Sequence, residues 1–171
     1  MPAVSHCTQP APWPHYQHAV VDIAFPAHRI RVVPGPGHLE AGRAFPLDGA
    51  HTIHIVTAFN PGGRLATAHA NLRAQHELLQ LLGLRGLRWW PAVGGDLADM
   101  HAEISAAVVG LDDAEARALG RSYGQDAVFA WSPTSWRLLA CADAAHDTVI
   151  TDWHATLLMP PTHRPVPLSA A

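Results

Sequence analysis

A carboxylate, three amides, two arginines and a serine stand near predicted strand and helix ends, where side chains can reach a small molecule. A glutamate can act as a general acid or base when its surroundings shift its pKa, and amides donate and accept directed hydrogen bonds. An arginine after two glycines, near the start of a helix, suits an anionic group such as phosphate or carboxylate. The sequence predicts a site for a small polar or anionic molecule, with Glu103 as the catalytic candidate and Asn60, Arg64, Asn71, Ser105, Arg121 and Gln125 as ligand-binding candidates.

A structural interpretation of the same side chains is equally open. Asn60, at the end of a predicted strand, can cap its own turn, and Asn71, on the core row of a helix, can tie that turn to the helix. Glu103 can form an ordinary ion pair with one of the arginines, and Gln125 can bond to carbonyl groups at a helix end. The residue types and their spacing favour neither interpretation over the other.

Histidine spacing and sequence motifs predict neither a metal site nor a cofactor. Of the 13 histidines, His51 and His54 point to opposite faces of a strand, and His69 and His76 lie two helical turns apart. None of these pairs has the i, i+4 spacing of a helical zinc site. The chain also lacks a nucleophile elbow, a Walker or dinucleotide-binding loop and an HExxH motif.

Composition and charge restrict the class of protein. With 171 residues, of which 49% are hydrophobic and 15% charged, the chain is expected to form a globular domain. All 11 basic residues are arginine, so a Schiff-base lysine and a P-loop lysine are excluded. The formal net charge of −3, with the arginines spread along the chain, argues against a nucleic-acid partner, because such binding normally needs a basic patch.

The two ends of the chain set the expected domain boundaries. Residues 1–13 and 160–171 are rich in Pro and small residues and predict two tails, which leave a single α+β domain over residues 14–159. The N-terminal residues lack a signal-peptide pattern, and no run approaches 18 apolar residues, so we expect a cytoplasmic protein without a membrane partner. Cys7 and Cys141 lie far apart in sequence and predict no disulfide.

A strand, a turn and a helix that follow one another in the chain must position most of the site. Residues of high β propensity alternate up to Asn60, and a Pro-Gly-Gly turn follows. Thr67 is the expected N-cap of the next helix, which ends at Gly83, and a second helix starts after Asp112 with capping-box spacing to Glu115. The other expected strands are His18–Phe25, Arg29–Val33, Leu87–Val93, Glu103–Val109, Asp126–Trp131, Trp136–Cys141 and Val149–Met159.

The order of these elements predicts an α+β fold with a ferredoxin-like split βαβ core (βαββαβ), extra flanking strands and two main helices on one sheet face. The right-handed crossover rule makes the first two core strands parallel and inserts the third between them, antiparallel to both. This arrangement would bring Asn60, Asn71, Glu103 and Gln125 to one end of the sheet.

Four segments of the chain, VTAFNPGG, HANLR, HAEISAAVVGL and YGQDAVFAW, occur in this order. In this combination the chain resembles the bacterial family known as domain of unknown function 3293, over roughly Tyr16 to Cys141. Members often carry a Trp shortly before the Glu and an aromatic residue after it, whereas this chain has Met100, His101 and Ile104. The resemblance implies an uncharacterised domain and no particular activity. It rests on Thr57, Ala58, Asn60, Pro61, Asn71, Glu103, Gly124 and Gln125.

Three classes of function are consistent with these observations. The first is a domain that binds a small polar or anionic molecule at the polar end of its sheet. The second is a hydrolase or transferase with Glu103 as general acid or base. The third is a structural or protein-interaction module without a ligand, because open ferredoxin-like sheets often dimerise or pair through their edges; a homodimer belongs to this third class.

Overall fold

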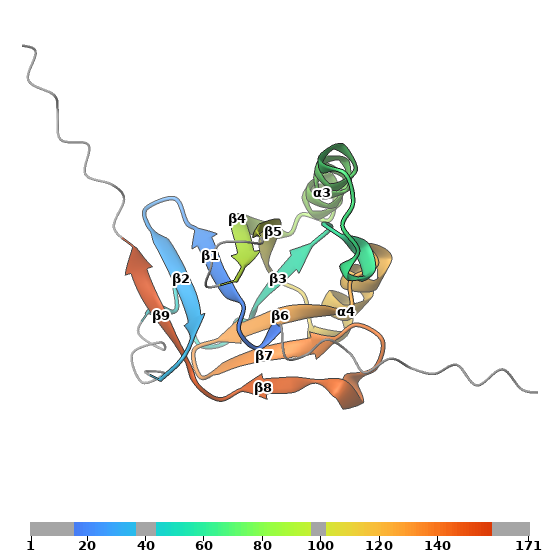
Figure 1. The fold of residues 1–171 in the computed structure, drawn as a ribbon. Helices are drawn as coiled ribbons and strands as arrows, with labels where there is room; N and C mark the ends of the chain where they lie inside the picture. The colour runs from blue at the N-terminus through green and yellow to red at the C-terminus, as the bar shows by residue number, and fades with distance from the viewer. Residues whose placement is uncertain (1–15, 37–43, 97–101, 159–171) are drawn as a thin grey trace, which may run out of the picture.

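The computed structural model describes residues 16–36, 44–96 and 102–158. Nine strands form one antiparallel sheet, which two α-helices and two short 3-10 helices accompany (Figure 1). The predicted tails, residues 1–13 and 160–171, lie outside the described residues, so the division of the chain into a domain and two tails stays a prediction. The strands are β1 Val20–Ala24, β2 Arg29–Pro34, β3 Ile53–Thr57, β4 Arg88–Gly95, β5 Ala102–Val109, β6 Ala127–Ser132, β7 Ser135–Ala140, β8 Thr148–Ile150 and β9 Trp153–Leu158; the helices are η1 Pro61–Gly63, α3 Ala68–Leu84, α4 Asp113–Ser122 and η2 Ala144–His146.

The sheet curls into a nearly closed, barrel-like form. Its strand order is β8-β7-β6-β3-β5-β4-β1-β2-β9, so β8 and β9 are its two edges. These edges are consecutive in the chain and are separated only by Thr151 and Asp152. A connection of two residues is short, so the end of β8 and the start of β9 lie close together. The backbone N–H of Gly35, next to β2, also donates to the carbonyl of Asp152 at 2.8 Å.

The predicted ferredoxin-like α+β class is wrong, because the molecule is a strand-rich, barrel-like sheet with only two α-helices among the described residues. The four expected core strands do form, and β5 lies between β3 and β4, antiparallel to both. However, β1, β2 and β9 extend the sheet on one side and β7 and β8 extend it on the other. These five strands bend the sheet around a second core, which an open ferredoxin-like sheet does not contain.

The second core, which we call the inner core, fills the inside of the curled sheet. On β3, Ile53 and Ile55 point into it, and they alternate with residues that point outward. Aromatic rings supply much of its volume: Phe45 packs edge-on against Trp131, with ring centroids 4.9 Å apart and an interplanar angle of 83°. Other members of the inner core are Val21, Ile23, Ile30, Val32, Ala107, Val109, Trp136, Ile150, Trp153 and Ala155.

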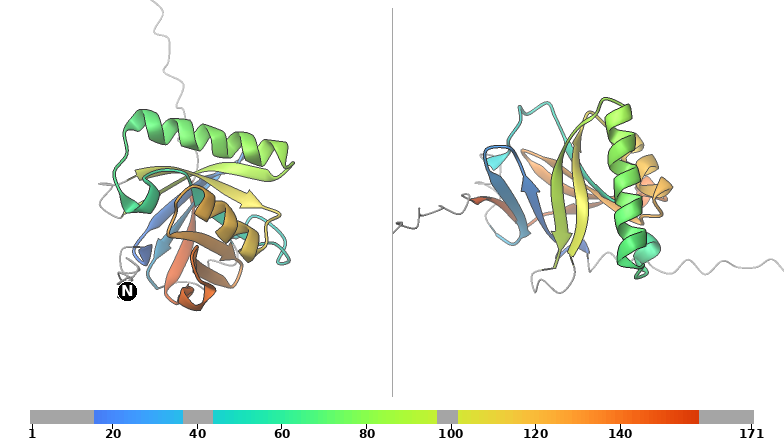
Figure 2. Two further views of the ribbon diagram at one scale, coloured as in Figure 1. Left: turned by 90° about the vertical axis from the view of Figure 1, so that its right-hand side faces the viewer. Right: turned by 90° about the horizontal axis from the view of Figure 1, so that it is seen from above.

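The outer core lies between the outside of the sheet and the two helices. Figure 2 shows α3 and α4 together on one side of the molecule, with β1, β2 and β9 on the opposite side. Helix α3 packs over β4 and β5, whereas α4 packs over β3, β6 and β7. The outer core is formed by Val56, Ala58, Leu78, Leu82, Ala106, Val108, Leu111, Ala116, Leu119, Val128, Ala130, Leu139 and Cys141.

The starts of both helices are as expected. The Thr67 hydroxyl accepts a hydrogen bond from the backbone N–H of Ala70, which is the predicted N-cap of α3. Asp112 and Glu115 form the predicted capping box at the start of α4, with bonds of 2.8 and 3.0 Å. On α3, Asn71 and Gln75 face the sheet, whereas Leu72 is 54% exposed.

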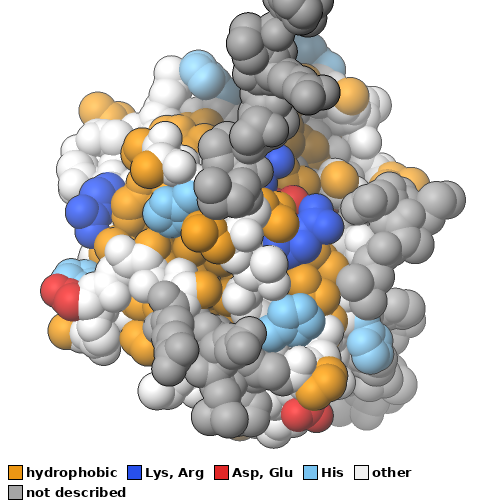
Figure 3. Space-filling model, turned by 90° about the vertical axis from the view of Figure 1, so that its left-hand side faces the viewer, with side chains coloured by type: hydrophobic (Ala, Val, Ile, Leu, Met, Phe, Trp, Pro, Cys, Tyr) orange, Lys and Arg blue, Asp and Glu red, His pale blue; other side chains and the backbone are white. Residues whose placement is uncertain are grey.

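Neither α3 nor α4 packs on the side of the sheet formed by β9, β2 and β1. Its surface combines apolar side chains with basic and histidine side chains (Figure 3). Across β1 and β2, Arg31 donates two hydrogen bonds of 2.7 Å to the carboxylate of Asp22. The helices therefore concentrate on the opposite side, where the candidate site residues also lie.

Candidate functional site

The turn that leaves β3 is held in an unusual backbone conformation. Asn60 has φ 48° and ψ 59°, and it is the only residue other than glycine with a positive φ among the described residues. Asn tolerates this left-handed region better than most residues because its short amide bonds locally. The carbonyl of Asn60 accepts from the N–H of Gly63 at 2.9 Å, and the N–H of Gly62 donates to the carbonyl of Gly124 at 2.7 Å. The turn is thereby bonded to the end of α4.

The side chain of Asn60 is the centre of a hydrogen-bond cluster. Its Oδ1 accepts from the N–H of Ala66 at 3.0 Å and from Nδ2 of Asn71 at 2.9 Å. Its Nδ2 donates to Oε1 of Glu103 at 2.8 Å. The backbone N–H of Asn60 also donates to Oδ1 of Asn71 at 2.9 Å. We call Asn60, Asn71 and Glu103, with Gln75 and Gln125, the amide cluster.

Three buried amides serve the backbone of three consecutive residues at the end of β3. Gln75 Oε1 accepts from the N–H of Ala58 at 3.0 Å, Gln125 Nε2 donates to the carbonyl of Phe59 at 2.8 Å, and Asn71 receives the N–H of Asn60. Each of these side chains is at most 9% exposed. The chain is leaving the sheet here and has lost its ladder partners, so the amides replace them.

Glu103 and Ser105 lie at the start of β5. By alternation they share the side of the strand that carries Ala107 and Val109, which belong to the inner core. Glu103 is half-buried, whereas Ser105 is buried and its Oγ donates to the carbonyl of Glu103 at 3.2 Å. The carboxylate therefore stands at one end of the barrel-like sheet, and Asn60 orients it.

Tyr16 belongs to the same end of the sheet. Its ring packs edge-on against Phe129 of β6, with centroids 6.4 Å apart. Burial raises the pKa of Tyr16 to about 12, and the negative charges of Asp126 and Glu103 add to this shift, with a smaller effect from Cys141. Tyr16 is therefore a neutral phenol at neutral pH, in a region of negative potential.

The two candidate arginines do not pair with Glu103 among the described residues. Arg121, in the last turn of α4, donates through its guanidinium to the carbonyl of Cys141. Arg64 is exposed at the end of the turn. The backbone N–H groups of Gly62, Gly63 and Arg64, which were expected to meet an anion, donate to carbonyls within the protein.

Four of the seven predicted site residues thus lie in the amide cluster, and Ser105 lies beside it, bonded to the backbone of Glu103. The two arginines lie outside the cluster. Their roles toward a ligand stay predictions. Sequence reasoning missed Gln75 and Tyr16. Gln75 could have been found, because it lies one helical turn after Asn71 on the same buried row. Tyr16 carries no such signal, because its place depends on contacts with residues more than 80 positions away.

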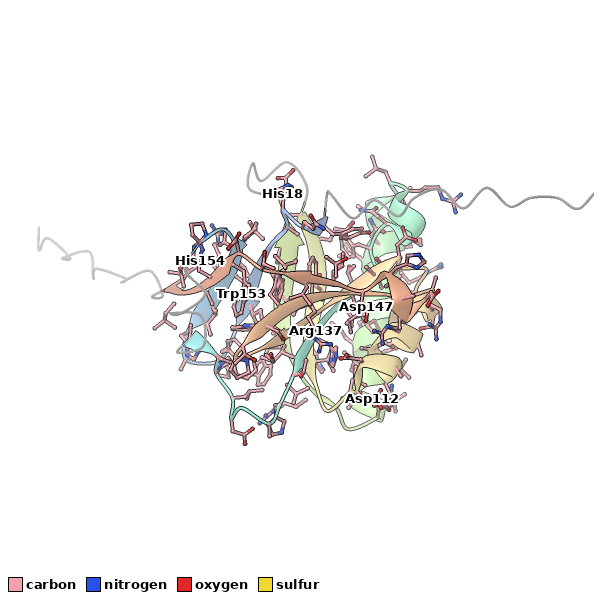
Figure 4. The ribbon with its side chains drawn as sticks, turned by 90° about the horizontal axis from the view of Figure 1, so that it is seen from below. His18, Asp112, Arg137, Asp147, Trp153 and His154 are labelled. Atoms are coloured by element: carbon pink, nitrogen blue, oxygen red, sulfur yellow. The ribbon has the colours of Figure 1, made fainter. Side chains whose placement is uncertain are left out.

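A second polar group lies at the opposite end of β3. His54 Nε2 is 3.0 Å from Asp113 Oδ1, and Arg137 donates to both oxygens of Asp113 at 2.6 and 3.2 Å. Figure 4 labels Arg137 on β7 and Asp112 at the start of α4, on the same side of the molecule. An open surface depression of about 880 Å³ borders these side chains and also His51 and Arg117.

The pKa values of this second group shift for identifiable reasons. Burial lowers the pKa of His54, and this effect exceeds the opposing influence of Asp113. For Asp113, burial acts to raise the pKa, but the hydrogen bonds and charges of Arg137 and His54 outweigh it and lower the pKa. No group of three or more His, Cys, Asp or Glu side chains in the described ranges is arranged to hold a metal ion.

The fold and the amide cluster define a small, barrel-like antiparallel domain with an oriented carboxylate at one end. Residues 56–128 match the model of the family described as "Protein of unknown function (DUF3293)", so this stretch of the chain is similar to that family. The resemblance seen in the sequence is confirmed, over a shorter range than Tyr16 to Cys141. The matched range contains the whole amide cluster. No curated protein and no solved structure matches the chain, and none of the described helices is long and apolar enough to cross a membrane.

Proposed function

We propose that this domain binds a small polar molecule at the end of the sheet marked by Glu103, with the carboxylate as an acceptor for hydrogen-bond donors of the ligand. The observation that carries the proposal is the 2.8 Å bond from Asn60 Nδ2 to Glu103 Oε1. Asn60 is itself fixed by bonds to Ala66 and Asn71, so the carboxylate is oriented before any ligand arrives. The mouths of barrels are also frequent sites for small ligands.

The charges around Glu103 indicate the kind of ligand. Asp126 and Glu103 make this region negative, and their charges add to the effect of burial in raising the pKa of Tyr16. The N–H groups of the Pro-Gly-Gly turn are already bonded within the protein. A ligand rich in N–H or O–H donors, neutral or cationic, therefore fits better than an anion, for which the exposed Arg64 is the remaining candidate.

A structural role is the second candidate, and a specific observation favours it. Asn71, Gln75 and Gln125 are buried and each bonds to the backbone at the end of β3. These amides stabilise the turn whether or not the domain binds a ligand. The two candidate functions therefore differ only in the role of Glu103. If Glu103 serves only to hold Asn60, it needs no ligand. An acid/base role of Glu103 in a hydrolase or transferase would require the binding proposed here as its first step.

Thermal unfolding of the wild type and of Glu103→Gln separates these candidates. The panel contains amino acids, polyamines, sugars and nucleosides as donor-rich ligands, with sugar phosphates and nucleotides as anions. Glu77→Gln, on the exposed side of α3, is the matched control. A ligand at 100 times its Kd stabilises the folded state by about 2.7 kcal/mol.

We expect a donor-rich ligand to raise the melting temperature of the wild type and of Glu77→Gln but not that of Glu103→Gln. If no ligand raises the melting temperature of the wild type, and Glu103→Gln alone melts markedly earlier than Glu77→Gln, then Glu103 is structural. If only anions stabilise all three proteins, the binding site lies elsewhere.

A further inference from the structure

His54 occupies an unusual position for an ionisable side chain. It lies on β3, in the middle of the sheet, and none of its surface is exposed. Its neighbours in register are Val108 on β5 and Ala130 on β6, which are apolar. By alternation with Ile53 and Ile55, the imidazole points outward, toward α4.

One carboxylate connects this imidazole to two other elements. Asp113, the first residue of α4, bonds to His54 on β3 and through two hydrogen bonds to Arg137 on β7. The side chain of Asp113 is 33% exposed, whereas that of His54 is 1% exposed. Three hydrogen bonds of Asp113 therefore hold the first turn of α4 on the sheet, two to Arg137 and one to a buried imidazole whose protonation state can change.

Only one neutral form of the imidazole, with the proton on Nε2, can donate to Asp113 without adding a charge to the buried site. Nε2–H then donates to Asp113, and Nδ1 keeps a lone pair that has no partner among the described residues. A proton added to Nδ1 would create a buried N–H without an acceptor and a buried charge. The charged groups that face His54 are Asp112 and Asp113 from α4 and Arg137 from β7; the two carboxylates favour the proton and the guanidinium opposes it, while burial dominates.

We propose that His54, Asp113 and Arg137 form a latch that holds the first turn of α4 on the sheet and releases it when His54 takes up a proton in weakly acidic solution. Release exposes the imidazole to water, where it binds a proton from solvent at an ordinary pKa near 6.5. Proton uptake therefore stabilises the open state relative to the closed one. The far end of α4 reaches the turn after β3 through the bond between Gly124 and Gly62, so the latch and the amide cluster share one helix.

Hydrogen exchange of the full chain between pH 5 and pH 8 tests the latch. Protection factors, which correct for the intrinsic pH dependence of exchange, are compared between α4 and α3 in the same sample. His54→Gln is the test variant, because the Gln amide can donate to Asp113 and does not titrate. His76→Gln is the matched control, since His76 is exposed on α3.

In the wild type we expect the protection of the first turns of α4 to fall by up to about 30-fold from pH 8 to pH 5, the limit for one histidine that is neutral when closed and titrates near 6.5 when open. The protection of α3 should change much less. His76→Gln should behave like the wild type. In His54→Gln, the protection of the first turns of α4 should no longer fall between pH 8 and pH 5. Equal pH dependence of α4 in the wild type and in His54→Gln, or none in either, would overturn the latch.

NMR titration of the His54 ring in the wild type gives a second readout, which needs no variant protein. The latch requires a neutral imidazole with the proton on Nε2 at pH 7, and protonation that coincides with the loss of α4 protection. A His54 ring that gains its proton while α4 stays protected would contradict the proposal.

Discussion

Asn60 and Asn71 exchange two hydrogen bonds of 2.9 Å: the backbone N–H of Asn60 donates to Asn71 Oδ1, and Nδ2 of Asn71 donates to Asn60 Oδ1. This reciprocal pair joins the left-handed residue after β3 to the first turn of α3. Because Asn60 also donates to Glu103, Asn71 orients the Glu103 carboxylate indirectly, through Asn60. Both the stability of the turn and the geometry at Glu103 should therefore depend on Asn71.

Asn71→Leu keeps roughly the volume of the side chain but removes both hydrogen bonds between Asn71 and Asn60. The N–H of Asn60 then lacks an acceptor in a partly buried setting, and we expect a loss of about 1–3 kcal/mol in the free energy of unfolding. Urea denaturation measures this loss. Leu72→Asn, at the neighbouring exposed position, should change stability by less than about 0.5 kcal/mol. Equal stability of Asn71→Leu and the wild type would show that the pair is dispensable.

Gly124→Ala tests the contact between the end of α4 and the turn. Gly124 has φ 69°, and a Cβ there would lie 2.8 Å from Pro61 Cβ. Gly86→Ala is a close control, because Gly86 has φ 66° and a Cβ there would meet nothing within 4 Å. The control should lose about 1–2 kcal/mol from backbone strain alone. Gly124→Ala should lose about 1–3 kcal/mol more through overpacking; similar losses in both variants would mean that the turn moves freely away from α4.

Two glycines inside helices should respond to alanine in opposite directions. At Gly83 in α3 a Cβ would meet nothing within 4 Å, so Gly83→Ala should stabilise the protein by about 0.5–1 kcal/mol through helix propensity. At Gly120 in α4 a Cβ would lie 2.6 Å from Cys141 Sγ and 2.7 Å from Val128 Cγ1. Gly120→Ala should therefore destabilise the protein despite the better propensity. The melting temperatures of both variants test this prediction. A higher melting temperature of Gly120→Ala would refute the tight packing of α4 on β6 and β7.

The free energy of unfolding should fall as the pH is lowered, in two separate ranges. The pKa of His54 is lower in the folded state than its ordinary 6.5, so the unfolded chain binds more protons and the contribution of His54 is lost as pH falls below that value. The pKa of Asp113 is lowered from 3.8, so its contribution is lost in more acidic solution, as pH falls through the folded pKa. Each proton contributes a slope of at most about 1.4 kcal/mol per pH unit.

Urea denaturation from pH 2 to pH 8 checks this dependence. In His54→Gln, the free energy of unfolding should no longer fall in the first pH range and should still fall in the second. His76→Gln, which alters an exposed imidazole, serves again as the control. A curve for His54→Gln that parallels the wild type between pH 5 and pH 7 would assign the first range to other histidines.

The local elements could be predicted from the sequence because their signals are local. Thr67, Asp112 and Glu115 cap their helices as their types and spacing predicted. The grouping of Asn60, Asn71, Glu103 and Gln125 at one end of the sheet follows from the predicted order of the core strands, since β5 lies between β3 and β4. The hydrogen-bond partners of these side chains could not be predicted from the sequence, because a side chain at a strand end has several acceptors within reach.

The barrel-like closure could not be predicted from local patterns, and this is why the ferredoxin-like class was wrong. Closure depends on β2 pairing with β9, which joins Arg29 to Leu158 across most of the chain. One signal was present in β3: Ile53, His54, Ile55 and Val56 are all buried. A strand buried on both faces needs a core on each side, and a sheet with helices on one face supplies only one.

The pairing of β2 with β9 has a consequence during synthesis. Pro34 pairs with Trp153, so even the closest pair in sequence requires 119 further residues to leave the ribosome (153 − 34). Until then β2 presents an unpaired edge to its surroundings, and such edges recruit other strands. The last strand thus completes the sheet and also covers the edge through which a nascent chain would aggregate.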